Sequence, residues 1–243
     1  MKKHLILIIF LSIITESYAQ FVFNKEKIYG NGQIITEERS LPDFNKLSVT
    51  GAYDVKIVPG KTGLIKVTAD KNLMQAIDIF VKSGKLIIRT HPDFNIRKYS
   101  RLQVEVPAEN LSAVFLTGSG SITQTGFVVN NNIKLYLTGS GDMKFELNNN
   151  RTTVGLTGTG DIILKGKTDD LKINLTGTGK VTAHRVMAQK ATVKLTGTGE
   201  ISVQAVYDLV IKIFGSGDVF YYGEPTRLKV KTFGSGEAFY KDL

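Results

Sequence analysis

The chain has 243 residues, of which 42% are hydrophobic, and it contains neither Cys nor Trp. The lack of Cys excludes a disulfide-stapled fold and a thiol-linked lipid anchor, so we expect packing and hydrogen bonding to stabilise the protein. The formal net charge of +9 at pH 7 is compatible with acidic polysaccharides, lipid headgroups or nucleic acid as partners, although scattered solvated lysines would give the same charge.

Residues 1–19 are a predicted secretory signal peptide. Lys2 and Lys3 precede the apolar run Leu5–Ile14, and a small-x-small cleavage site ends at Ala19. The apolar run is too short to span a bilayer as a helix. We therefore expect an exported protein in the periplasm, on the cell surface or outside the cell, with no transmembrane segment in the mature chain.

Residues 20–40 are expected to form an N-terminal extension, followed by a single β-solenoid domain over residues 41–243. The stretch Leu47–Val67 begins like the repeats further on and predicts a degenerate rung. The remainder of residues 41–110 is irregular, and we expect it to cap the first open rung. The elements predicted there are a short helix at Lys71–Ile77, strands around Ile79–Val81, Leu86–Thr90 and Leu102–Val106, and a loop with the sequence HPDFNIRKYS.

Residues 111–243 repeat a Gly-Ser/Thr-Gly motif seven times at intervals of about 19 residues. Apolar residues alternate with polar ones on both sides of each motif, which is the period of a strand. A fixed interval between paired strands predicts an all-β solenoid with about 20 residues per rung, in which stacked rungs share one core. The predicted corner glycines are Gly118, Gly120, Gly139, Gly141, Gly158, Gly160, Gly177, Gly179, Gly197, Gly199, Gly215, Gly217, Gly234 and Gly236.

The glycines are interpreted as sharp corners, because a side chain would hinder the close backbone approach that stacked corners need. The Ser or Thr between the two glycines of each corner should align as a hydroxyl ladder, as should the threonines just before the corners, with side-chain hydrogen bonds along the axis. Turns such as Glu146–Arg151 and Gly166–Asp170 are expected to close each coil. The ladder threonines are Thr117, Thr138, Thr157, Thr176 and Thr196.

The glycine motifs do not match a phosphate-binding loop. A dinucleotide fingerprint needs a helix after the glycines, and a strand pattern follows instead. The Gly-Lys-Thr within Val58–Gly63 has no first glycine at the required spacing, because Val55 stands there, so we interpret this segment as a hairpin turn. We therefore expect no cofactor.

Acidic residues after the corners resemble calcium-binding β-roll repeats, but the interval is twice as long, and Ser121 and Lys180 interrupt the series. No metal site is expected. The two histidines of the mature chain, His91 and His184, are interpreted as surface residues, so no catalytic residue is predicted. The acidic series comprises Asp142, Asp161, Glu200, Asp218 and Glu237.

One face carries outward lysines but few aromatic residues, so we expect no nucleic-acid binding. Aromatic residues crowd instead into the last two repeats, where Phe214 and Phe233 replace the threonine of the ladder. This cluster predicts an aromatic cap over the core or, alternatively, a surface for self-association or ligand binding. The outward lysines are Lys134, Lys172, Lys194, Lys212, Lys229 and Lys231. The candidate interaction residues are Tyr136, Phe220, Tyr221, Tyr222, Phe239 and Tyr240.

The segments FNKLSVTGAYDVKIVPG, GKLIIRT and LQVEVPAENLSAVFLTGSGSI, followed by the repeated corners, resemble an exported bacterial family labelled putative auto-transporter adhesin, head GIN domain. The resemblance covers residues 41–240. It implies a right-handed, single-stranded β-helix from Bacteroidetes-type bacteria, with no established enzymatic activity or cofactor. We therefore expect an exported, non-catalytic cell-envelope interaction or adhesin-like protein whose partner is an envelope protein or polysaccharide. The alternative is a glycan-binding or polysaccharide-processing β-helix protein.

Overall fold

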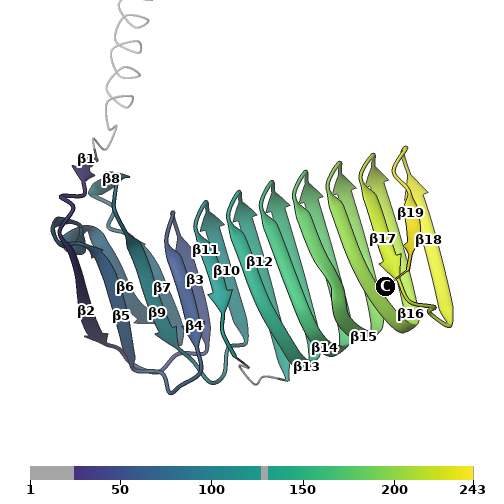
Figure 1. Ribbon diagram of the computed structural model, residues 1–243, viewed down its shortest axis with the longest axis horizontal. Coiled ribbons are helices and arrows are strands. Elements are labelled where there is room, and N and C mark those ends of the chain that lie inside the picture. The colour runs from purple at the N-terminus through teal and green to yellow at the C-terminus, as the bar shows by residue number, and fades with distance from the viewer. Residues whose placement is uncertain (1–24, 127–130, 243) are drawn as a thin grey trace, which may run out of the picture.

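The computed structural model describes residues 25–126 and 131–242, so the predicted signal peptide lies outside the described residues. Strands make up 71% of the described residues and are arranged as a parallel β-solenoid of about seven turns spaced about 19 residues apart. Figure 1 shows the turns stacked along one axis, with an irregular assembly of strands at the N-terminal end. The predicted all-β solenoid is therefore confirmed.

Each regular rung consists of a strand, a glycine corner and a second strand. We call the surface formed by strands before the corners the pre-corner face, and the surface formed by strands after them the post-corner face. The regular strands are β10 (Ala113–Gly118), β11 (Ser121–Gln124), β12 (Asn132–Gly139), β13 (Asp142–Gly158), β14 (Asp161–Gly177), β15 (Lys180–Gly197), β16 (Glu200–Gly215), β17 (Asp218–Tyr222), β18 (Arg227–Phe233) and β19 (Ala238–Lys241).

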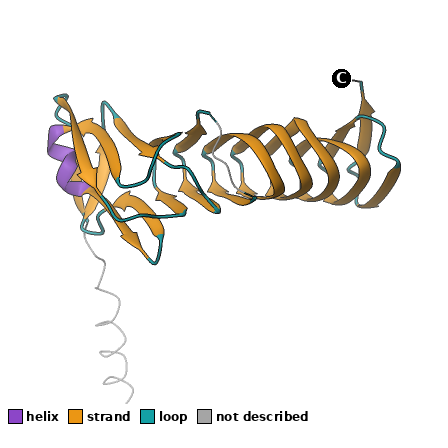
Figure 2. Cartoon of the chain, turned by 90° about the horizontal axis from the view of Figure 1, so that it is seen from below, coloured by secondary structure: helices purple, strands orange, loops and turns teal. Residues whose placement is uncertain are grey.

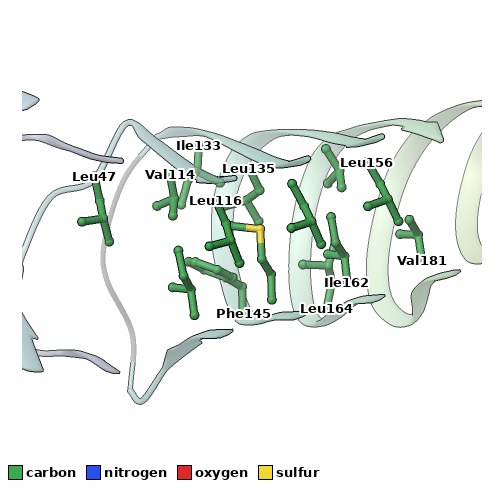
Figure 3. Close-up of a cluster of buried hydrophobic side chains, with 14 of the residues drawn as sticks. Leu47, Val114, Leu116, Ile133, Leu135, Phe145, Leu156, Ile162, Leu164 and Val181 are labelled. Atoms are coloured by element: carbon green, nitrogen blue, oxygen red, sulfur yellow. The ribbon is translucent and has the colours of Figure 1, made fainter. Parts of the chain in front are cut away.

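Equivalent residues of successive rungs pair in parallel register, which stacks the apolar positions. Leu135 pairs with Val154, which in turn pairs with Ile173, and all three side chains are at most 1% exposed. Figure 3 shows such side chains, including Leu156 and Ile162, filling the interior between the two faces. Burial of this continuous apolar column is the main stabilising contribution to the fold, because a single rung could not enclose its own apolar side chains.

The turns predicted opposite the corners are not turns. Glu146–Arg151 lies inside β13 and Gly166–Asp170 inside β14, and both segments pair with their neighbours around the bend, for example Asn148 with Lys167. Because the backbone of each rung pairs with rungs on both sides, strand hydrogen bonding persists where the chain changes direction. We call this region the far bend.

The predicted degenerate rung is confirmed. The strands β3 (Lys46–Thr50) and β4 (Asp54–Val58) pair in parallel with β10 and β11, so they form the first rung of the stack. Beyond this rung, β7 (Lys85–Thr90) pairs in parallel with β3, and β9 (Leu102–Pro107) pairs in parallel with β4.

Antiparallel strands then end the stack. β6 (Ile77–Lys82) pairs with β7, β5 (Leu64–Asp70) pairs with β9, and β2 (Ile34–Ser40) pairs with β5. Because β9 lies between β4 and β5, the segment Val58–Gly63 is not the predicted hairpin turn; it crosses from one side of β9 to the other.

Two further elements complete this N-terminal cap, which Figure 2 shows at one end of the solenoid. The predicted helix is the 3₁₀ helix η1 (Lys71–Ala76). The predicted HPDFNIRKYS loop contains a strand, β8 (Phe94–Lys98), which pairs in parallel with β1 (Glu26–Tyr29). Residues 26–40 of the expected extension thus join the cap through β1 and β2.

Asp70 holds three segments of the cap together. Its carboxylate is fully buried and accepts hydrogen bonds from the backbone N–H of Gly32 (2.6 Å), the N–H of Ser100 (2.7 Å) and the Ser100 hydroxyl (3.1 Å). Burial alone would raise the pKa of Asp70. The hydrogen-bond donors lower the pKa by more than burial raises it, so the pKa of Asp70 lies below its ordinary value. The carboxylate is therefore ionised in the folded protein at neutral pH.

Candidate functional site

At the Gly197 corner the backbone N–H groups that could face a phosphate are already hydrogen-bonded to the preceding rung. Gly197 has φ +118°, and a Cβ there would overlap the carbonyl oxygen of Gly177. The N–H groups of Thr198 and Gly199 both donate to that same oxygen, at 3.1 and 3.0 Å. Because anion-binding loops present unpaired N–H groups to their ligand, this corner cannot act as one.

The threonine ladder is aligned but not hydrogen-bonded as predicted. Thr138 pairs in register with Thr157, and Thr157 with Thr176, yet no side-chain hydrogen bond joins the ladder threonines. The predicted hydroxyl hydrogen bond between residues that lie between the corner glycines is present at the last two corners, where Ser235 and Ser216 are 2.9 Å apart. The ladder thus lines an exposed edge of the pre-corner face.

The acidic series lies along the post-corner face without forming a metal site. Asp142 pairs in register with Asp161, but the next position is Lys180, which forms an ion pair with Glu200 at 2.6 Å. Within residues 25–126 and 131–242, no group of three or more His, Cys, Asp or Glu side chains could hold a metal ion.

A second series of charged residues lies along the far bend. We call this series the far-bend charge ladder. Arg151 pairs with Asp170 at 3.3 Å, and Asp208 contacts both Lys190 (3.9 Å) and Arg227 (2.5 Å). The Arg227 side chain holds the pKa of Asp208 below its ordinary value. Asp170, Lys190, Asp208 and Arg227 line a cavity of about 870 Å³, but each of them belongs to one of these ion pairs.

The histidines occupy different environments. His91 is partly exposed beside Asp93, as predicted for a surface residue. His184 is less exposed than predicted: its ring lies 4.9 Å from that of Tyr222, and its Nδ1 atom is buried without a hydrogen-bond partner in the described chain. Burial and the charge of Arg185 lower the pKa of His184, so the imidazole is neutral at pH 7.

The aromatic residues of the last two rungs divide between the outside and the inside. Phe214 and Phe233 stack on the pre-corner face, with ring centroids 5.0 Å apart. Phe220 and Phe239 stack at 5.6 Å on the post-corner face. Phe233 is 60% exposed and Phe239 is 38% exposed, so the C-terminal end carries an accessible apolar patch on each face.

Lysines extend over both outward pairs. The Lys194 ammonium lies 5.3 Å from the Phe214 ring centroid, and the Lys241 ammonium lies 5.5 Å from that of Phe220. Each pair therefore combines an apolar ring face with a cation. We call the two pairs and these lysines, which form one patch on each face of the last two rungs, the aromatic–basic surface.

The tyrosines Tyr221 and Tyr240 have a different role. They pair in register in the column of inward positions that includes Val203, and Tyr221 packs against the core. Their placement favours the predicted cap over a binding surface. Tyr222 packs on His184.

Tyr136 lies far along the solenoid from these residues, so the six candidate interaction residues do not form one site. Its ring stacks on Phe115 at 5.5 Å with an interplanar angle of 11°. Phe115 was missed from the sequence, although it precedes Tyr136 by one repeat and pairs with it in register. Aligning outward positions as well as glycines would have revealed the pair.

In the described part of the chain, no helix has the length and apolar character that crossing a membrane requires. Comparison with family models matches residues 43–225 to the family described as putative auto-transporter adhesin, head GIN domain. No curated protein matches the sequence.

Several solved structures share the fold. A putative adhesin from Bacteroides fragilis superposes with a TM-score of 0.84 at 20% identity, covering 88% of this chain and 100% of that one. A putative adhesin from Parabacteroides merdae gives 0.76 at 18% identity, covering 90% and 99%. A protein from Parabacteroides distasonis titled a putative lipid binding protein gives 0.73 at 24% identity, covering 89% and 100%.

Proposed function

This chain belongs to the putative auto-transporter adhesin, head GIN domain family, and from that premise we propose that it is an exported, non-catalytic protein that binds partners of the cell envelope through its outer faces. The adhesin-like family and its structural neighbours support export and a binding role. The solenoid supplies a rigid support on which outward side chains repeat at fixed intervals.

The aromatic–basic surface is the observation that carries this proposal. Most outward positions of the solenoid hold polar residues, whereas here two stacked phenylalanine pairs face outward beneath lysine side chains. Exposed aromatic residues bury a large apolar area when a partner covers them, and aromatic residues are enriched at the centres of interfaces.

A polysaccharide-processing enzyme is less well supported. Such an enzyme needs a carboxylic acid that stays protonated near neutral pH to protonate the leaving group. The far-bend cavity is lined by two carboxylates, Asp170 and Asp208, and Arg227 lowers the pKa of Asp208. That shift disfavours a general acid, so the groups there are better explained as stabilising ion pairs between rungs.

An adherence assay with coated beads tests the proposal. Beads that carry the mature protein should be retained on immobilised envelope material from the native bacterium, and replacing Phe233 and Phe239 by Ser should reduce retention about five- to tenfold, because both rings leave the interface. The matched control is Tyr207→Ser, which removes a 55% exposed aromatic ring elsewhere on the surface and should leave retention unchanged.

Retention equal to that of uncoated beads would contradict the proposal, as would equal loss in the Tyr207 variant. Release of reducing sugar from the polysaccharide fraction of the envelope material would instead favour the enzyme.

A further inference from the structure

A second cavity, of about 350 Å³, opens on the pre-corner face beside the N-terminal cap. Ala113 forms its floor and is in register with Lys46 on one side and Lys134 on the other. Lys85 follows Lys46 in the same row. The cavity exists because a buried alanine occupies one position in a row of long lysine side chains.

The three lysines are not neutralised by neighbouring carboxylates. Among residues 25–126 and 131–242, no ion pair involves Lys46, Lys85 or Lys134, in contrast to the far-bend charge ladder. None of the described residues that line the cavity is acidic. Three positive charges around one small cavity favour the binding of an anion there, because no ion pair within the described chain offsets these charges.

Phe115 provides an apolar wall next to these charges. The Lys85 ammonium lies 5.4 Å from its ring centroid, so one lysine contacts both the wall and the cavity. Tyr136 supports the wall from behind, because its ring stacks on Phe115.

Gly155 in turn makes room for Tyr136. A Cβ at Gly155 would lie 2.5 Å from the Tyr136 Cδ1 atom, so a residue with a side chain would push the ring away. Glycine inside a strand is unfavourable unless close packing requires it. The wall is therefore held in position before any ligand binds, which reduces the entropic cost of binding.

We propose that this cavity binds an anionic sugar unit of an acidic polysaccharide, one whose pyranose ring carries a carboxylate or a sulfate. The sugar's anionic group would contact the lysines, and its apolar C–H groups would pack against Phe115. The cavity has the size of a small-ligand site, and a single aromatic wall does not supply the successive stacking platforms that single-stranded nucleic acid needs. The inference rests on the proposed non-catalytic binding role but concerns a site separate from the aromatic–basic surface.

Titration calorimetry of the mature protein tests the inference with three probes: an oligogalacturonate, a sulfated oligosaccharide and a neutral galacto-oligosaccharide. The wild type should bind at least one acidic probe and not the neutral one. The double variant Lys46→Gln/Lys134→Gln should bind about tenfold more weakly or worse, and with a smaller dependence on salt, because two cations are removed. Whether the carboxylated or the sulfated probe binds more tightly identifies the anionic group.

Phe115→Leu should weaken binding about fivefold while leaving the salt dependence unchanged, because it alters only the apolar wall. The matched control is Lys212→Gln, which removes an exposed lysine of the same face several rungs away and should leave the affinity unchanged. Melting curves show whether each variant is folded.

Absence of binding to both acidic probes, equal binding of the neutral sugar, or equal weakening by Lys212→Gln would overturn the inference. So would tighter binding to phosphatidylcholine vesicles that contain phosphatidylglycerol, which would indicate a lipid-headgroup site. A negative result in the calorimetry would not change the conclusion from the bead assay, because the bead assay tests Phe233 and Phe239, at the other end of the solenoid.

Discussion

Replacing Gly197 with Val should destabilise the protein by more than about 4 kcal/mol or prevent it from folding. The new side chain would meet the Gly177 carbonyl, which already accepts two hydrogen bonds, and φ +118° is strained for a β-branched residue. Relaxing this overlap would separate two rungs, so the damage would extend to the backbone pairing of the whole corner. Urea unfolding followed by circular dichroism measures the effect.

Thr198→Val is the matched control, since it places the same side chain one residue further along the same corner. The side chain of Thr198 is exposed, so this substitution should change the free energy of unfolding by no more than about 0.5 kcal/mol. A Gly197→Val protein with wild-type stability but without ligand binding would show that the corner is a binding loop after all.

Replacing Asp70 with Ala should cost about 3 kcal/mol, because the N–H groups of Gly32 and Ser100 would lose a charged acceptor inside the cap. The loss should concentrate in the cap, so hydrogen exchange should accelerate in β2 and β5 more than in β14. Asp169→Ala, which removes an exposed carboxylate, serves as the control and should be close to neutral. Unchanged exchange in the cap would contradict this role of Asp70.

The Asp70 carboxylate should also make the free energy of unfolding depend on pH. Because the folded pKa of Asp70 lies below its ordinary value of about 3.9, its stabilising contribution is complete above that value and is lost as the pH falls through the folded pKa. The wild type should therefore lose stability on acidification below about pH 4. The Asp70→Ala variant should lose less over the same range in urea unfolding, and equal losses would exclude Asp70 as the cause.

The regular part of the fold was predictable because each rung repeats the same sequence pattern, a glycine motif flanked by alternating apolar residues. The glycine spacing located the corners, and the alternation on either side located buried residues such as Leu135 and Ile173. The far bends were not predictable in this way. Polar residues such as those of Glu146–Arg151 are typical of turns, but pairing with rungs on both sides keeps their backbone in a strand.

The cap depends on contacts between segments that are distant in sequence. Nothing local to Val58–Gly63 indicates that β9, which begins only at Leu102, inserts between β4 and β5. Likewise, β8 becomes a strand because β1 lies beside it. Long-range pairing of this kind overrides local propensity.

The candidate site was only partly predictable for a related reason. The C-terminal aromatic cluster was visible in the sequence, but the division between outward Phe220 and inward Tyr221 depends on register. The cavity beside Phe115 depends on Ala113 and on residues that four strands, β3, β7, β10 and β12, bring together.

Labelling of intact cells tests the central claim most directly, namely that this protein presents its outer faces to partners of the cell envelope as an adhesin does. A membrane-impermeant amine reagent, followed by mass spectrometry, reports which lysines are accessible from outside. We expect the exposed Lys212 and Lys229 to be modified in intact cells as fully as in lysed cells. Modification of these lysines only after the outer membrane is permeabilised would place the protein inside it and contradict the adhesin-like role.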